Sequence, residues 1–294
     1  MTFFGSGRDG GERSPLLPDP SNPGRRRMLV LAVAAVGLTA ARSRIHAGAE
    51  QAAGTQIPPP APPPHGAAPE VRLPVLTENG AKVPVGVSVD HPMEIAHHVT
   101  VLTVVNDRDP IPSKGEFVFS AANGQAYVAF QARLDDGPST VRVAVECSQG
   151  RRWDGAGTTR VADGAGGCTG APPKPASSAG EIRAPVIRLP RLLRGEHVRP
   201  GELLDVQVGI RHPVRTGLER RGGAWTQVAE PFYLTELEVF LDAERISRFA
   251  LTPAVSDNPL ITFRLRARAD GLIRVVFHNS RGARLEAAQP MRLG

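Results

Sequence analysis

The sequence has few aromatic residues and no basic run in which aromatic side chains are interleaved. Phe, Trp and Tyr make up 5% of the 294 residues, although the formal net charge is +6. Nucleic-acid binding is therefore not expected, because single-strand binding surfaces combine cationic and stacking aromatic side chains. The excess of Arg in the second half of the chain is interpreted as a solvated surface, since net charge bears on solubility and association rather than on fold.

The sequence also lacks the short motifs that carry several kinds of catalysis. It contains no Gly-x-Ser-x-Gly nucleophile elbow, no phosphate-binding loop and no dinucleotide fingerprint. His97 and His98 are adjacent on an expected strand, where they would face opposite ways, so no metal site is predicted. We expect a protein that is not an enzyme and that holds no cofactor.

The first 49 residues have the pattern of a targeting segment. Three Arg at 25–27 precede an apolar stretch, 28–41, that is too short to span a bilayer of about 30 Å. Small residues at 47–49 offer a cleavage site. Residues 1–49 are predicted to be a twin-arginine signal that exports the protein to the periplasm, with no stable membrane insertion after cleavage. An uncleaved membrane anchor is the alternative.

Proline, glycine and β-branched residues organise the rest of the first half. Residues 50–69 include a run of Pro and are predicted to be an extended tether. Within 70–162, apolar residues alternate with polar or small ones, as at 83–89 and 141–147. Turn signals separate such runs, and turns are expected at 107–112 and at 112–115, among others. With no convincing helix, this pattern predicts a β-sandwich.

A change of composition separates this module from a second one. Residues 163–180 are rich first in Gly and then in Pro, which is typical of a linker. Residues 181–294 again alternate, with apolar residues on one face of 260–269 and Arg on the other. A hairpin is expected at Asp270-Gly271. The sequence therefore predicts an all-β protein with two β-sandwich modules joined by a Gly/Pro-rich linker.

Cys168 is the residue on which we expect the chemistry to depend. It follows Gly166 and Gly167 and stands two residues before Gly170. Because glycine leaves the backbone unhindered, the thiol is expected to be exposed on a mobile arm that can enter another protein's pocket. No His or carboxylate is obviously placed to activate it, which argues against a catalytic nucleophile.

Two alternatives remain for this thiol: it could be inert, or it could form a disulfide with Cys147, because exported proteins favour disulfides. Against the disulfide, Cys147 shares an apolar strand face with three Val at 141, 143 and 145. That face predicts a buried Cys147 that behaves as a small hydrophobic residue.

The Gly-Gly-Cys element at 166–168, which ends the first module, resembles the cysteine arm of the SoxY family. The first module is also similar to SoxY at 78–85 and 90–93, and the second is similar to SoxZ at 182–184, 210–218, 255–259 and 277–282. This resemblance covers nearly all of 70–294. It implies two immunoglobulin-like sandwiches that pair as a periplasmic carrier, with sulfur intermediates of thiosulfate oxidation held on Cys168 and Gly166, Gly167 and Gly170 forming a flexible arm.

The resemblance also implies partners: c-type cytochromes that load the thiol, a hydrolase that releases sulfate, and a sulfane dehydrogenase. This chain departs from the families in carrying both modules, in continuing beyond the arm, and in having Val214-Arg215 where Met-Glu is usual. Fused carriers also occur beside quinoprotein dehydrogenases, so an accessory carrier of that kind stays open, as does a structural binding module without thiol chemistry. The linker is expected to favour docking of the modules within one chain.

Overall fold

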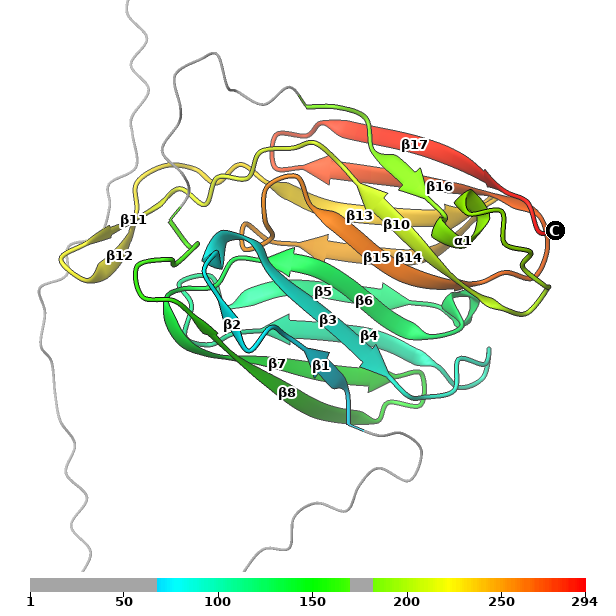
Figure 1. Ribbon diagram of the computed structural model, residues 1–294, viewed down its shortest axis with the longest axis horizontal. Helices are drawn as coiled ribbons and strands as arrows, with labels where there is room; N and C mark the ends of the chain where they lie inside the picture. The colour runs from blue at the N-terminus through cyan, green and yellow to red at the C-terminus, as the bar shows by residue number, and fades with distance from the viewer. Residues whose placement is uncertain (1–67, 170–181) are drawn as a thin grey trace, which may run out of the picture. The chain divides into compact units, whose positions relative to one another are not determined.

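The computed structural model describes residues 68–169 and 182–294, and almost all regular structure in these ranges is β-strand (Figure 1). The predicted signal segment, most of the predicted tether, and Gly170 lie outside the described residues. Residues 68–169 and 182–294 belong to one compact unit. No helix within 68–169 or 182–294 is long and apolar enough to cross a membrane.

The first module contains eight strands and two short 3-10 turns. Its elements are β1 (Glu70–Arg72), β2 (Leu76–Thr77), η1 (Gly80–Lys82), β3 (Val83–Val89), β4 (Val99–Val105), β5 (Ser113–Phe119), η2 (Ala121–Asn123), β6 (Ala126–Ala132), β7 (Gly137–Cys147) and β8 (Arg152–Val161). The predicted alternation is confirmed, because every second residue of β3 and β7 is buried. A turn expected at 112–115 is wrong from Ser113 onward, where β5 begins.

The second module contributes the remaining strands and one helical turn. Its elements are β9 (Val186–Arg188), α1 (Pro190–Leu193), β10 (Leu203–Gly209), β11 (Leu218–Arg221), β12 (Ala224–Gln227), β13 (Leu234–Leu241), β14 (Glu244–Leu251), β15 (Leu260–Arg266), β16 (Gly271–Asn279) and β17 (Arg284–Met291). The expected face of β15 is confirmed, since Ile261, Phe263 and Leu265 are fully buried. The predicted all-β fold of two immunoglobulin-like β-sandwich modules is confirmed as well.

Strands of the two modules share both large sheets. One sheet has the order β1-β3-β6-β15-β10-β9, and the other has the order β17-β16-β13-β14-β5-β4-β7-β8-β2. The modules meet where β14 pairs antiparallel with β5 over five residue pairs and where β15 pairs with β6 over two. We call this boundary the seam. Hydrogen-bonded strands therefore join the modules in addition to the linker.

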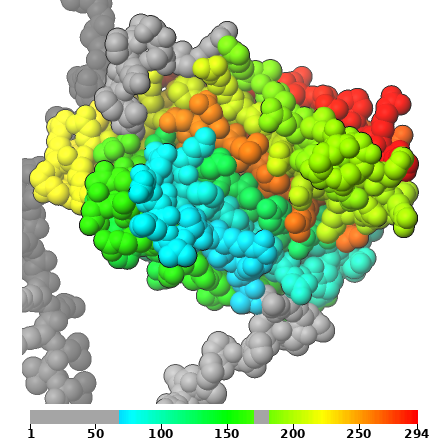
Figure 2. Space-filling view, in the orientation of Figure 1, coloured from blue at the N-terminus to red at the C-terminus, as the bar shows by residue number. Residues whose placement is uncertain are grey.

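The hydrophobic core also continues across the seam. The ring of Phe249, from β14, lies 5.3 Å from that of Phe117 of β5 and 5.7 Å from that of Phe263. Phe117 in turn lies 5.0 Å from Phe130 of β6. In the space-filling view the orange residues of the second module lie directly against the cyan and green residues of the first (Figure 2). The two sandwiches thus share buried apolar side chains.

Candidate functional site

The Gly-Gly-Cys segment lies folded against the first module. The NH of Gly80, in η1, donates a hydrogen bond to the carbonyl of Ala165 over 2.8 Å. The NH of Gly167 donates to the carbonyl of Leu134, just after β6, also over 2.8 Å. Two separate parts of the module therefore hold the segment. The expectation of an exposed, projecting arm is wrong for this conformation.

Close packing explains the glycines of this segment. A Cβ added to Gly167 would lie 2.1 Å from the backbone N of Ala81, and one added to Gly166 would lie 2.8 Å from Oδ1 of Asp135. Gly80 is equally confined, because a Cβ there would lie 2.7 Å from the N of Gly167. Only residues without a Cβ allow the two backbones to approach this closely.

Cys168 is buried at the seam, with 2% of its surface exposed. Its carbonyl accepts a hydrogen bond from Oγ1 of Thr216, in the second module, over 3.1 Å. The carbonyl of Gly167 accepts one from Nη1 of Arg133, in the first module, over 3.0 Å. Side chains of both modules therefore fix the backbone around the thiol.

The buried side chain of Arg133 connects this segment to a loop of the second module. Its Nη2 lies 2.8 Å from Oδ2 of Asp257 and 3.4 Å from the carbonyl of Val214. Oδ1 of Asp257 also accepts a hydrogen bond from the NH of Val214. One planar guanidinium, with donors in a fixed geometry, thus links three parts of the seam.

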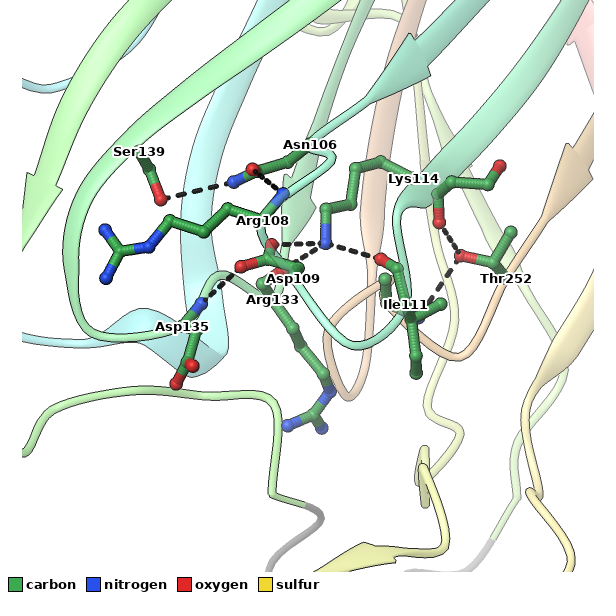
Figure 3. Close-up of polar contacts among 11 residues, drawn as sticks. Asn106, Arg108, Asp109, Ile111, Lys114, Arg133, Asp135, Ser139 and Thr252 are labelled. Carbon is green, nitrogen blue, oxygen red and sulfur yellow. Dashed lines mark hydrogen bonds and ion pairs between the residues drawn. The ribbon is translucent and has the colours of Figure 1, made fainter. Parts of the chain in front are cut away.

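A fully buried ion pair lies beside this network, between Asp109, in the connection from β4 to β5, and Lys114, in β5. Nζ of Lys114 lies 2.6 Å from Oδ2 of Asp109, and both side chains are 0% exposed. Lys114 also donates to the carbonyls of Ile111 and Arg133, over 2.9 and 3.0 Å. Oδ1 of Asp109 accepts from the NH of Asp135 over 2.9 Å, which completes the chain of contacts in Figure 3. The two charges are thus paired and hydrogen-bonded, as buried charges must be.

The surroundings of Cys168 keep its proton in place. Burial, together with the negative charge of Asp109, raises the pKa of the thiol to about 12. The charges of Lys114 and Arg133 lower the pKa, but they do not offset burial. Because the thiolate is the nucleophilic form of cysteine, Cys168 is poorly reactive in this conformation.

The hairpin of β11 and β12 contributes an ion pair beside the segment. Nη1 of Arg220 lies 3.3 Å from Oδ1 of Asp136 and 3.9 Å from Oδ2 of Asp135. The NH of Gly164 donates to Oδ2 of Asp136 over 3.3 Å, and this hydrogen bond holds the pKa of Asp136 below its usual value. Burial instead raises the pKa of Asp135. An ion pair between the modules thus borders the thiol.

The alternative of a disulfide between the two cysteines is excluded in this fold. Cys147 ends β7, whereas Cys168 lies beside Leu134, close to the start of that strand. The ten residue steps of β7 correspond to about 33 Å, and a disulfide requires Cα atoms within about 7 Å. Both thiols are free. The prediction that Cys147 is buried is confirmed, with 2% of its surface exposed.

Several residues of the site are not recognisable in the sequence. Asp109 lies in a stretch that predicts only a turn, and Lys114 lies where a second turn is expected. Arg133 and Thr216 stand 34 and 48 residues from the carbonyls that they bind. Buried charged residues do not follow the apolar alternation that identifies a strand, so they can be recognised only from the residues that they contact in the fold.

Fold and site together define a pair of β-sandwiches that enclose a neutral thiol at their seam. Residues 61–168 match the family model of the sulfur oxidation protein SoxY, and residues 193–290 match that of the sulphur oxidation protein SoxZ. The chain belongs to the SoxY and SoxZ families, which it joins in one polypeptide. The resemblance found in the sequence is thereby confirmed, and a carrier or accessory role in sulfur oxidation follows from it.

Comparison with curated proteins returned no match. Among solved structures, the chain is similar to a superoxide reductase (neelaredoxin) from Ignicoccus hospitalis, at 15% identity and a TM-score of 0.28, over 41% of this chain and 87% of that one. It is also similar to the SGBP-B protein of a mixed-linkage glucan utilization locus of Bacteroides ovatus, at 13% identity and a TM-score of 0.19. That match covers 76% of this chain and 47% of the other.

Proposed function

We propose that this protein is a periplasmic carrier that holds sulfur intermediates on Cys168 and presents them to partner enzymes of thiosulfate oxidation. The observation that supports it most is the position of Cys168. It is the last residue of the SoxY match, and side chains of both modules hold it at the seam. The twin-arginine pattern, which lies outside the described residues, supports export of the folded protein.

The chemistry of such a carrier can be written with balanced steps. Loading joins the outer sulfur of thiosulfate to Cys168: the thiol loses its proton, and two electrons pass to a c-type cytochrome as the sulfur–sulfur bond forms. A hydrolase then adds water to the terminal sulfonate, which leaves as hydrogen sulfate and leaves a persulfide on Cys168. A sulfane dehydrogenase would then oxidise the outer sulfur of the persulfide to a sulfonate: three waters supply the oxygen, seven protons are released, and six electrons pass to a c-type cytochrome.

These steps require the segment to leave the seam, because a buried thiol of raised pKa cannot enter a partner's pocket. Three hydrogen bonds to Leu134, Arg133 and Thr216 hold residues 167 and 168. At about 1 kcal/mol each, they hold the open population to roughly 1% or less. The buried conformation is thus the resting state of the carrier, and Gly166, Gly167 and Gly170 give the released arm its reach.

The test is the intact mass of mature protein from the native periplasm, with and without reductant, followed by peptide mapping. The carrier proposal expects sulfur-containing adducts on Cys168 that reductant removes. Cys168→Ser is expected to lose the adducts and to keep the melting temperature, whereas the matched Cys147→Ala variant keeps the adducts. A mapped Cys168 that is unmodified while thiosulfate is being oxidised would contradict the proposal.

The burial of Cys168 favours one other candidate, a structural binding module in which this thiol does no chemistry. Its 2% exposure and its pKa of about 12 are what an inert thiol would show. Sulfur oxidation in cells that carry Cys168→Ser separates the two candidates. A structural module would support oxidation at the wild-type rate, whereas a carrier would not.

A further inference from the structure

The end of the first module opposite Cys168 brings together three side chains that can bind metal. One ring nitrogen each of His91 and His97 and Sγ of Cys147 all lie within 4.8 Å of one another. Ligand atoms around a tetrahedral zinc ion, with bonds of about 2.0–2.3 Å, lie roughly 3.5 Å apart. Small side-chain rotations therefore close the distances. The prediction that excluded a metal rested on His97 in a strand, but His97 precedes β4.

Backbone hydrogen bonds hold the segment that carries His97. The NH of Glu94 donates to the carbonyl of His97, and the NH of His97 donates to the carbonyl of Glu94, both over 3.0 Å. This tight turn is tied to the end of β7, because the NH of Ser148 donates to the carbonyl of His98 over 2.8 Å. Cys147 is paired with Val99 of β4 in the same sheet. The three candidate ligands therefore stand on parts of the fold that are fixed to one another.

The orientation of His91 suits a metal ligand. Its Nδ1 lies 2.7 Å from the carbonyl of Pro92, which can only accept, so Nδ1 carries the proton and Nε2 has the lone pair. Metal-binding histidines are commonly oriented by such a hydrogen bond from the other ring nitrogen to a carbonyl. The ring also stacks on Trp153, with centroids 5.4 Å apart and planes 22° apart, and meets His97 edge-on at 4.4 Å.

We propose that His91, His97 and Cys147 form a binding site for one zinc or copper ion. Two imidazoles and one thiolate are donors that zinc and copper prefer, whereas magnesium and calcium prefer oxygen. His97 is partly exposed, which gives the ion a path to the site. The site lies about 33 Å from Cys168 by the length of β7, so it acts independently of that thiol.

The test uses the full chain in a Cys168→Ser background, stripped with a chelator, so that Cys147 is the one thiol left. Zn²⁺ competition against a chromophoric chelator is expected to show one site per chain. Co²⁺ is expected to give a thiolate charge-transfer band that Cys147→Ser abolishes. His91→Gln and His97→Gln are each expected to lower Zn²⁺ affinity about tenfold or more. A separate titration with Cu⁺ shows which of the two metals binds more tightly.

His98→Gln is the matched control, because His98 is the neighbour of His97 and is outside the cluster. Zn²⁺ is expected to raise the melting temperature of the parent and of His98→Gln, but not that of the ligand variants. If Cys147→Ser fails to fold, the Zn²⁺ affinity of His97→Gln, which changes only a residue of the surface turn, still tests the proposal. Equal affinity of the parent and His97→Gln, or no binding of either metal, would overturn the proposal.

Discussion

At the scale of single residues, Cys168 is a thiol whose surroundings decide whether it reacts. The carboxylate whose charge acts most strongly on its pKa, that of Asp109, already pairs with Lys114. The same residue can therefore be inert while covered and an ordinary nucleophile once released. Its reactivity measures the opening of the segment.

Alkylation of Cys168 in the folded protein at pH 8 is expected to be about a hundredfold or more slower than in urea-unfolded chain. The pKa of about 12 leaves almost no thiolate in the closed state. Equal alkylation rates in the folded and unfolded chains would contradict this prediction.

The raised pKa of Cys168 also makes the stability of the fold depend on pH. Its contribution to the free energy of unfolding is fully present below the unfolded pKa of about 8.5 and is lost as the pH rises from there towards 12. The stability advantage of the parent over Cys168→Ala is therefore expected to shrink across that range in denaturant titrations.

Gly167→Ala is expected to release the segment, because the new Cβ would lie 2.1 Å from the N of Ala81. Alkylation of Cys168 should then speed up at least tenfold, with a smaller effect on the melting temperature. Gly164→Asn is the matched control: no heavy atom lies within 4 Å of a Cβ there, and Asn tolerates its positive φ of 78°. An unchanged rate in Gly167→Ala would show that the packing does not hold the segment.

At the scale of elements, a buried ion pair joins the connection from β4 to β5 to strand β5, because Asp109 of the connection pairs with Lys114 of the strand. Removing one partner leaves the other charge buried and uncompensated, which typically costs about 3–5 kcal/mol. Asp109→Asn is expected to lose stability in this range in urea titrations. The double variant Asp109→Asn/Lys114→Met is expected to lose less, because it buries no charge.

The exposed pair of Arg142 and Asp107 provides the comparison. Their atoms lie 3.1 Å apart, but the side chains are 63% and 61% exposed. Asp107→Asn is therefore expected to change the unfolding free energy by less than about 1 kcal/mol. A loss in Asp109→Asn no larger than this would show that the buried charge is compensated in another way.

The strands were predictable where burial imposes a period, and Cys168 was predictable from the Gly-Gly-Cys element, but the side chains that enclose this thiol were not. Val83 to Val89 and Val141 to Cys147 alternate because one face of each strand is in the core. The cover over Cys168 instead consists of contacts between distant segments, as when Arg133 meets Asp257, 124 residues away. No local pattern encodes such a contact, so composition alone made the Gly-rich segment resemble a free arm.

At the scale of the whole molecule, the seam makes the two modules one folding unit. Cleavage at a protease site inserted within 170–181 is expected to leave both fragments together in size-exclusion chromatography. The reason is that the strand pairs β5–β14 and β6–β15 and the shared aromatic core remain intact. Phe249→Ala, which removes a buried ring from the seam, is expected to weaken this association by about 3–5 kcal/mol. Fragments that separate without any substitution would contradict it.

The cover over Cys168 also keeps the sulfur of one molecule away from that of another. While the segment is seated, two copies cannot join through their Cys168 side chains, and small oxidants meet a neutral sulfur with 2% exposure. Under the proposed carrier function, the protein can therefore wait in an oxidising compartment without a dedicated reductase. Cys168 is then open to oxidation only while the segment is released.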